Sequence, residues 1–264
     1  MATMRWMFGV VAALMLASTA LARAAEPAPG ATWVEPRTGI AFVWVPAGDV
    51  TMGCAPGAQP CPPEELPQHQ RHVGGFWMSR TEITQGQWRR LMDVNPSMYK
   101  KGDDYPVDQV HWEEALTFLG RLNDGAKGEF RLPTEAEWEY ACRAGHPGDA
   151  FCGGGDANAL AWYILNTSRS RSPMPVGQKT ANAFGLYDMT GNMWEWTADC
   201  WAESHAGAPG DGRARTDSAC LTHVLRGGSW GNYPAQLRAS ARRSDNDVKC
   251  PFIGLRLVRA PVTP

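Results

Sequence analysis

Residues 182–196 read Asn-Ala-Phe-Gly-Leu-Tyr-Asp-Met-Thr-Gly-Asn-Met-Trp-Glu-Trp, and they carry the strongest fold signal in the chain. Two strand-like pieces, residues 185–188 and 193–196, flank a Gly-Asn turn. Three more segments accompany this one in chain order. They are residues 78–84 (MSRTEIT), 131–140 (RLPTEAEWEY) and 225–230 (LRGGSW), the last followed by 254–257 (GLRL). Each segment alone says little, but the ordered set is specific.

Short β-strands are predicted along the whole chain. Residues 40–45 (IAFVWV), 50–53 and 72–79 have strand patterns, and residues 224–226 and 254–258 follow near the end. From residue 151 onward Gly, Asn, Pro and Ser dominate, and long loops separate the strand-like pieces. Few helices, many short strands and long ordered loops indicate an α+β fold.

Three helices are predicted in the first half of the chain. Thr84 begins a Thr-x-x-Gln capping box and Thr134 begins a Thr-x-x-Glu capping box. In such a box the first and fourth side chains each accept a hydrogen bond from a backbone N–H at the start of a helix. Residues 112–123 have the pattern of a third, amphipathic helix. Gly145 stands where a left-handed residue would end the helix that follows Thr134.

The N-terminal residues predict export. Arg5 precedes an apolar run at residues 6–20, and Ala-Arg-Ala follows, which is typical of a secretory signal peptide over residues 1–24. The run is shorter than the about 20 residues that span a bilayer, so we expect no membrane span after cleavage. An uncleaved anchor is the alternative. We expect a periplasmic or secreted protein, with a flexible lead at residues 25–38 and one domain at residues 39–260.

The charge balance bears on the partners. The chain has 25 Lys and Arg against 27 Asp and Glu, a formal net charge of −2. This balance gives no electrostatic footprint for nucleic acid or for an anionic membrane. The expected partner is therefore a secreted peptide, a metabolite or a periplasmic protein.

Two cysteine pairs bracket loops. Cys54 and Cys61 enclose a Pro/Gly loop, and Cys200 and Cys220 enclose a Gly/Pro/Asp loop. Because exported proteins form disulfides, each pair is predicted to be a disulfide staple. Spacing alone does not prove connectivity.

The other three cysteines are harder to place. Cys142 lies in a helical pattern and is predicted to be a buried apolar side chain. The pairing of Cys142, Cys152 and Cys250 stays open, and the odd total of seven leaves at least one free thiol or an intermolecular bond. The C-x-x-C spacing of structural zinc sites is absent from the sequence.

In their order, the four segments resemble the sulfatase-modifying-factor family, whose best-known members generate formylglycine. The resemblance runs from about residue 39 to about residue 258. It implies that family's fold, a C-type-lectin-like α+β domain that is poor in regular secondary structure and often binds calcium.

The resemblance fails at the catalytic cysteines. The family's activity rests on two cysteines after the Arg-Gly-Gly-Ser motif, which bind copper, and soft thiolates select Cu(I). Here the first of these positions holds Asn232, and Cys250 lies too close to the following Gly-Leu-Arg strand to match the second. We therefore expect neither copper nor formylglycine formation, and the catalytic residues are unknown. The family-site positions are Ser229, Trp230, Asn232 and Trp194.

Calcium is the cofactor that the resemblance implies. The family's pattern would use side-chain oxygens of Asp188 and Glu195 with the carbonyls of Gly191 and Met193. Hard cations prefer several oxygen ligands of this kind. The alternative is that Asp188 caps a turn and that Glu195 pairs with an arginine.

The polar and aromatic stretch after Trp230 lies where members of the family bind their peptide substrate. Such a mixture suits recognition of a peptide or a small polar ligand. The ligand-binding candidates are Tyr233, Gln236, Arg238 and Arg242. The alternative is that these arginines pair with the many acids of the motif segments.

Two functions are compatible with these observations. In the first, the protein assists the oxidation or maturation of a siderophore-like secreted metabolite or a periplasmic protein, as exported relatives without the cysteines act in siderophore maturation. In the second, it is a non-catalytic, calcium-stabilised module that binds a ligand or a protein. Fold alone does not decide between them.

Overall fold

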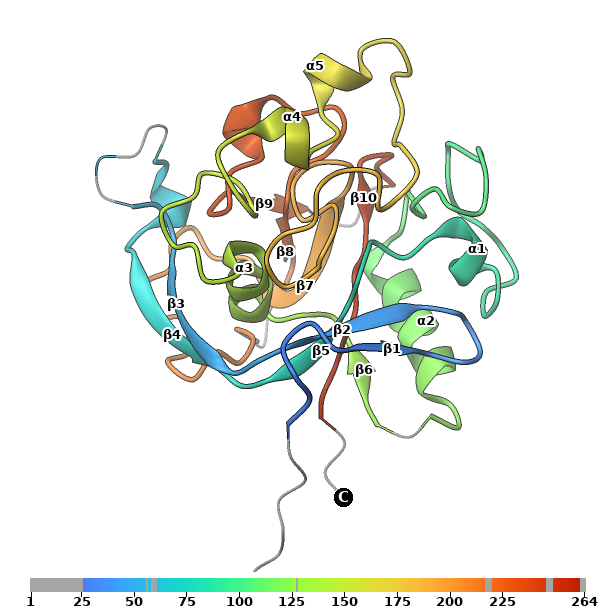
Figure 1. Cartoon of the computed structure of the whole chain (residues 1–264), viewed down its shortest axis with the longest axis horizontal. Coiled ribbons are helices and arrows are strands. Elements are labelled where there is room, and N and C mark those ends of the chain that lie inside the picture. Colours follow the sequence, from blue (N-terminus) through green and yellow to red (C-terminus); the bar gives the residue numbers. More distant parts are fainter. Residues whose placement is uncertain are drawn as a thin grey trace, which may run out of the picture.

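Two β-sheets organise the part of the chain that the computed structural model describes, residues 26–55, 57, 61–126, 128–216, 220–245 and 249–261 (Figure 1). The predicted signal peptide lies outside these residues. The five-stranded sheet has the order β1 (Thr32–Val34), β2 (Ala41–Val45), β5 (Phe76–Ser79), β11 (Val258–Arg259) and β6 (Phe130–Arg131). Its neighbouring strands are all antiparallel.

The second sheet has four strands and carries the signature segments. Its order is β10 (Ile253–Gly254), β7 (Trp194–Cys200), β8 (His223–Arg226) and β9 (Arg242–Asp245). β10 runs parallel to β7, and the other pairs are antiparallel. The register sets Glu195 opposite Arg226, and Arg226 opposite Arg242. A separate hairpin is formed by β3 (Gly48–Met52) and β4 (His69–Val73).

The helices are few and short. They are α1 (Gln85–Trp88), α2 (Trp112–Asn123), α3 (Glu135–Arg143), α4 (Ala157–Leu160) and α5 (Ile164–Thr167), with the 3-10 helices η1 (Pro63–Glu65) and η2 (Pro234–Gln236). Both predicted capping boxes are confirmed, at Thr84 and Thr134. α1 makes a single turn. At the end of α3 the predicted left-handed Gly145 is confirmed, with φ 84°, and the preceding cap residue Ala144 is left-handed as well, with φ 44°.

Three predicted segments differ in the structure. The predicted flexible lead at residues 25–38 contains β1, whose residues pair with β2, so the folded part begins earlier than residue 39. Residues 72–79 form parts of two strands, because Gly74 and Gly75 separate β4 from β5. Residues 185–188 are irregular instead of forming a strand, since their backbone groups bond locally and to Arg80.

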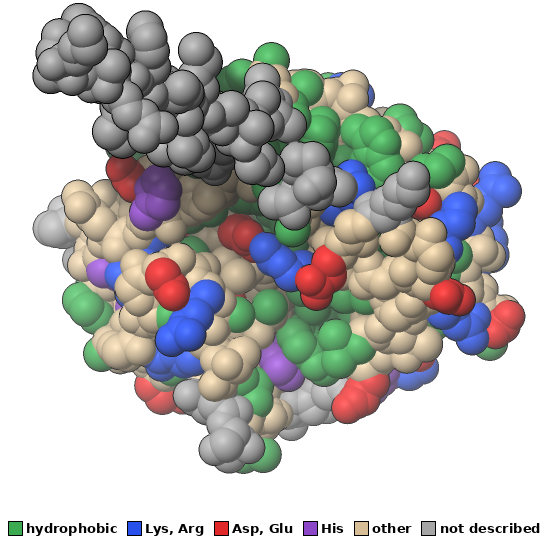
Figure 2. All heavy atoms as spheres, turned by 90° about the horizontal axis from the view of Figure 1, so that it is seen from below, with side chains coloured by type: hydrophobic (Ala, Val, Ile, Leu, Met, Phe, Trp, Pro, Cys, Tyr) green, Lys and Arg blue, Asp and Glu red, His purple; other side chains and the backbone are tan. Residues whose placement is uncertain are grey.

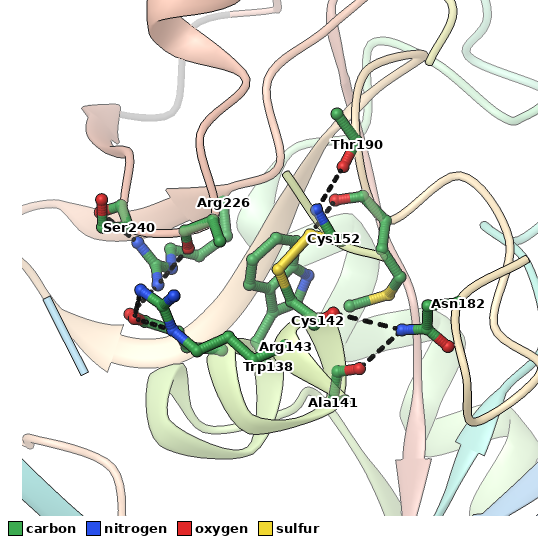
Figure 3. Close-up of a disulfide and its surroundings, with 12 residues drawn as sticks. Trp138, Ala141, Cys142, Arg143, Cys152, Asn182, Thr190, Arg226 and Ser240 are labelled. Carbon is green, nitrogen blue, oxygen red and sulfur yellow. Dashed lines mark hydrogen bonds and ion pairs between the residues drawn. A yellow bond between two sulfur atoms is a disulfide. The ribbon is translucent and has the colours of Figure 1, made fainter. Parts of the chain in front are cut away.

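Cys142 is buried, as predicted, and a third disulfide gives the pairing that the sequence left open. The structure forms both predicted staples, Cys54–Cys61 and Cys200–Cys220, but it also pairs Cys142 with Cys152. This third bond ties α3 to the loop beside the signature segment (Figure 3). The reason is local: the backbone N–H of Cys152 donates to Thr190 Oγ1 at 3.0 Å, which holds its sulfur against the helix.

The helices pack against the sheets through apolar side chains. Trp88 of α1 stacks on Phe118 of α2, with ring centroids 5.0 Å apart, and both belong to a core cluster with β7 and β10 residues. α3 enters a second cluster, in which Trp138 is fully buried. Burying an aromatic side chain of this size contributes about 2–3 kcal/mol, so these rings fix the long loops around them.

The surface carries charges of both signs. Figure 2, which views the molecule from below, shows Lys and Arg side chains interspersed with Asp and Glu on that face. None of the helices in the described ranges is long and apolar enough to span a membrane.

Candidate functional site

The turn before β7 depends on close backbone packing. Asp188 and Asn192 have φ near +54° and +58°, in the left-handed region that Asn and Asp tolerate better than other residues. Gly191 has φ 78°, and a Cβ there would lie 2.3 Å from the carbonyl oxygen of Trp162. Only glycine fits this position, which explains the Gly-Asn pair in the signature segment.

A buried acidic cluster lies behind this turn. Glu195 is fully buried and receives two bonds from Arg256, Nη2 to Oε1 at 2.8 Å and Nε to Oε2 at 2.9 Å. The indole of Trp138 donates to Glu195 Oε2 at 2.6 Å. Glu82, also fully buried, accepts from the backbone N–H of Met193 at 2.8 Å. Side chains from β7, α3 and the C-terminal segment therefore meet around one carboxylate.

Acids outnumber bases in this cluster. Burial, followed by the negative charges of Asp188 and Glu195, raises the pKa of Glu82 well above its usual range. Burial also raises the pKa of Asp188 to about 6. Asp188 Oδ2 accepts from the backbone N–H of Gly177 at 2.6 Å, whereas its buried Oδ1 has no hydrogen-bond partner among the described residues. Three buried carboxyl groups thus face the single guanidinium of Arg256.

The predicted calcium ligands fit only in part. Glu195 pairs with an arginine, as the alternative interpretation had it, so as placed it offers no free oxygen for a metal ion. Asp188 does fit, because its Oδ1 is buried and lacks a partner in the described structure. Oxygen of this type is a calcium ligand, and a cation here would offset the acidic excess.

Asn232 has a structural role at the position of the first family cysteine. Its Oδ1 accepts from the backbone N–H of Ser229 at 2.9 Å and from Ser229 Oγ at 2.7 Å. The neighbouring Trp230 is buried, and its indole donates to the Pro251 carbonyl at 3.3 Å while its ring packs on Phe252. The amide therefore closes the turn that a thiolate would leave open.

A cavity of about 580 Å³ lies in front of this turn, between η1, η2, β9 and the start of β7. It brings together five of the eight predicted family-site and ligand-binding residues. The lining residues used below are Trp194, Trp201, Asn232, Gln236, Arg238 and Arg242. Ser229 and Trp230 are buried beside it, and Tyr233 lies outside the lining with 61% of its surface exposed.

Both predicted ligand-binding arginines are ion-paired. Arg238 Nη1 lies 2.6 Å from Glu65 Oε2. Arg242 contacts Glu135 through Nε and Nη2, at 2.5 and 2.9 Å, and its guanidinium covers the ring of Trp201 at 4.8 Å. The alternative of arginines paired with acids is thus what the structure shows.

Beneath the cavity, the negative charge of Glu135 is compensated by neighbouring arginines. Burial alone would raise the pKa of Glu135, but Arg242 and Arg226 outweigh burial and lower it to about 2. Arg226 also pairs with Glu139 and donates to the carbonyls of Ser240 and Ala241, the former shown in Figure 3. The charged side chains beneath the cavity are therefore paired with one another.

One buried donor beside the cavity has no partner among the described residues. Trp194 is buried, and its Nε1 has no hydrogen-bond partner within the described part of the chain. A buried indole N–H normally finds an acceptor. With the aromatic face of Trp201 and the exposed amide of Gln236, the cavity suits a polar ligand that has a planar part and a carbonyl or carboxylate oxygen.

Sequence reasoning missed Trp201 and Glu65. Trp201 directly follows β7, the strand that carries Trp194, and this continuity was the available signal. Glu65 lies in a Pro-rich segment without a motif, and only the fold brings it to Arg238.

Residues 31–261 match the model of the sulfatase-modifying factor enzyme 1-like domain. The chain belongs to this family. It is similar to the chaperone protein LppX of Paenibacillus barcinonensis, with 29% identity over 71% of this chain and 81% of LppX. It is also similar to hercynine oxygenase of Mycolicibacterium smegmatis, with 28% identity over 84% of this chain and 62% of that protein, less than two thirds of its length.

The fold comparison agrees with this assignment. The solved structure of PvdO from Pseudomonas aeruginosa matches with a TM-score of 0.80 and 29% identity, over 88% of this chain and 98% of PvdO. The predicted fold class, the formylglycine-generating-enzyme type of α+β domain, is confirmed. Because the family includes an oxygenase, oxidoreductase activity is compatible with membership.

Proposed function

We propose that this family member is exported to the periplasm or secreted. There it assists the oxidation or maturation of a siderophore-like secreted metabolite or of a periplasmic protein, which it binds in the cavity beside Asn232. The observation that carries the proposal is the coincidence of this cavity with the family-site positions Asn232 and Trp194. The likeness to hercynine oxygenase supports an oxidative role.

The cavity residues bind and orient the substrate. The Trp194 N–H donates to an acceptor of the ligand once the ligand displaces the atoms that bury it. The Trp201 ring, held by Arg242, packs against the planar part of the ligand. Described residues of the cavity wall include neither cysteine nor histidine, so their own contribution is positioning.

Calcium is part of the proposal as a structural ion. Asp188 would hold it through the oxygen that lacks a partner within the described residues, and the Gly191 and Met193 carbonyls are the predicted co-ligands. The ion would supply positive charge to a cluster in which carboxyl groups outnumber guanidinium groups.

The test is a deletion strain of the source organism. Its secreted metabolites and periplasmic proteins are compared with the wild type by mass spectrometry, and a two-electron oxidation appears as the loss of two hydrogen atoms. We expect a reduced precursor to accumulate on deletion. The wild-type gene should remove it.

Three variants make this test specific. Trp194→Phe keeps an aromatic ring but loses the N–H donor, and Gln236→Ala removes an exposed amide at the cavity. Both should restore oxidation poorly. The matched control is Leu116→Ala, an exposed position on α2 outside the cavity lining. Full complementation by Trp194→Phe would contradict the assignment of the cavity.

A binding module is the second candidate function. The ion pairs of Arg238 and Arg242 favour it, because they explain both arginines without a substrate. The similarity to LppX, named a chaperone protein, points to a protein partner. In that case the deletion leaves every product mass unchanged, and a photo-crosslinking residue at Gln236 captures a periplasmic protein.

A further inference from the structure

Two cysteines and a histidine meet where β7 ends and β8 begins. The sulfur atoms of Cys200 and Cys220 and a ring nitrogen of His223 all lie within 4.8 Å of one another. Cys220 Sγ is 3.6 Å from His223 Nδ1 and 3.8 Å from Nε2. Among the residues that the structure describes, no other three His, Cys, Asp or Glu side chains are gathered this closely.

The fold holds this group in place. Cys200 lies opposite His223 in the β7–β8 ladder, so the two side chains are paired by strand register. Cys220 and His223 are separated by two residues, a spacing common among metal ligands that share a turn. The His223 ring stacks on Trp112 with centroids 3.3 Å apart and planes 8° apart, which fixes its orientation.

The two sulfur atoms are joined in the structure, and a disulfide does not supply thiolate ligands. We propose that reduction of the Cys200–Cys220 disulfide opens a Cys2His site for a borderline or soft divalent cation of the zinc type. Cys220 and His223 are partly exposed, so both a reductant and a metal ion can reach the group.

The chemistry balances with a dithiol as reductant. The dithiol transfers two electrons and two protons, its own sulfur atoms join, and the Cys200–Cys220 bond breaks to give two thiols. Zn²⁺ then displaces both thiol protons and binds two sulfur atoms and one nitrogen of neutral His223. Thiolate and imidazole are the ligands that zinc prefers, and three protein ligands leave a fourth position open.

The other two disulfides serve as internal controls. Within the described residues, neither Cys54–Cys61 nor Cys142–Cys152 has a third ligand close enough to complete a metal site. Cys200 directly precedes Trp201, which lines the cavity. A metal ion at this position therefore lies one residue from the cavity wall, although the proposed site does not depend on what the cavity binds.

The experiment measures zinc uptake by the full chain. Oxidised protein and protein reduced with a phosphine are titrated anaerobically with Zn²⁺ against a chromogenic chelator, and Co²⁺ is used as a spectroscopic probe. We expect the reduced protein to bind one equivalent, with thiolate-to-cobalt charge-transfer absorption, and the oxidised protein to bind at least about tenfold more weakly.

Variants separate this site from general thiol binding. His223→Ala should weaken zinc binding by about tenfold or more while the disulfide still forms, which titration of free thiols in the oxidised variant verifies. Cys54→Ser/Cys61→Ser should retain the full uptake. Equal uptake by oxidised and reduced protein, unchanged binding in His223→Ala, or cobalt spectra without thiolate bands would each overturn the proposal.

Discussion

Asp188→Asn tests the acidic cluster and the proposed calcium ion together. The variant keeps an oxygen that can accept from Gly177 and removes one of three buried carboxyl groups. Burial raises the pKa of Asp188 from 3.8 to about 6. The raised pKa means that folded protein binds this proton more tightly than unfolded protein does. Proton binding by Asp188 therefore stabilises the fold fully below about pH 4, and this stabilisation is lost as the pH rises through 6.

The pKa change sets the size of the effect. Two pKa units correspond to about 3 kcal/mol. In chelator at pH 7.5, Asp188→Asn should therefore be more stable than wild type by up to about 3 kcal/mol, and the difference should vanish near pH 4. Calcium at 100 times its Kd should add about 2.7 kcal/mol to wild type and little to the variant.

Urea unfolding followed by tryptophan fluorescence measures both quantities. A variant that is no more stable than wild type at pH 7.5 in chelator would refute the argument from buried charge. Equal stabilisation of both proteins by calcium would refute Asp188 as a calcium ligand and leave the charge argument intact. The two results are independent, because one is measured with chelator and the other with the metal ion.

Three other perturbations have defined outcomes. Arg256→Met leaves the fully buried Glu195 without its cation. The variant should be destabilised by about 3–5 kcal/mol, seen as a lower urea midpoint, and adding Glu195→Gln should recover part of this loss. Cys142→Ala/Cys152→Ala should cost about 2–3 kcal/mol by the same assay, and an unchanged midpoint would show that this staple adds no stability. A sulfatase-type cysteine peptide incubated with the protein and copper should gain no aldehyde by mass spectrometry, because Asn232 replaces a thiolate; turnover would disprove this.

Patterns confined to a few consecutive residues correctly predicted the helices and strands in which they lie. The capping boxes at Thr84 and Thr134 define their helix starts because each satisfies backbone donors within four residues. Strands bounded by turns, such as β2, were placed to within a residue. The pairing of Cys142 stayed open, since it depends on where the fold places the loop that carries Cys152.

The candidate site was predictable in its residues but not in its electrostatics. The family-site positions located the cavity through Trp194 and Asn232. No sequence pattern linked Arg238 to Glu65 or Glu195 to Arg256, which lie 173 and 61 residues apart and meet only through the sheets. Partners of buried charges are chosen by tertiary packing, so residue type alone left the alternatives open.

The first and last strands of the described chain share one sheet, β1 at one edge and β11 next to the opposite edge. In Figure 1 this sheet lies on the lower side, whereas α4 and α5 lie on the upper side, with the four-stranded sheet between. An affinity tag or surface tether attached just before β1 or just after β11 would therefore hold the molecule on the side away from α4 and α5. Immobilised protein should present the side with α4 and α5 to solution in one orientation, which makes the chain suitable for attachment to a sensor.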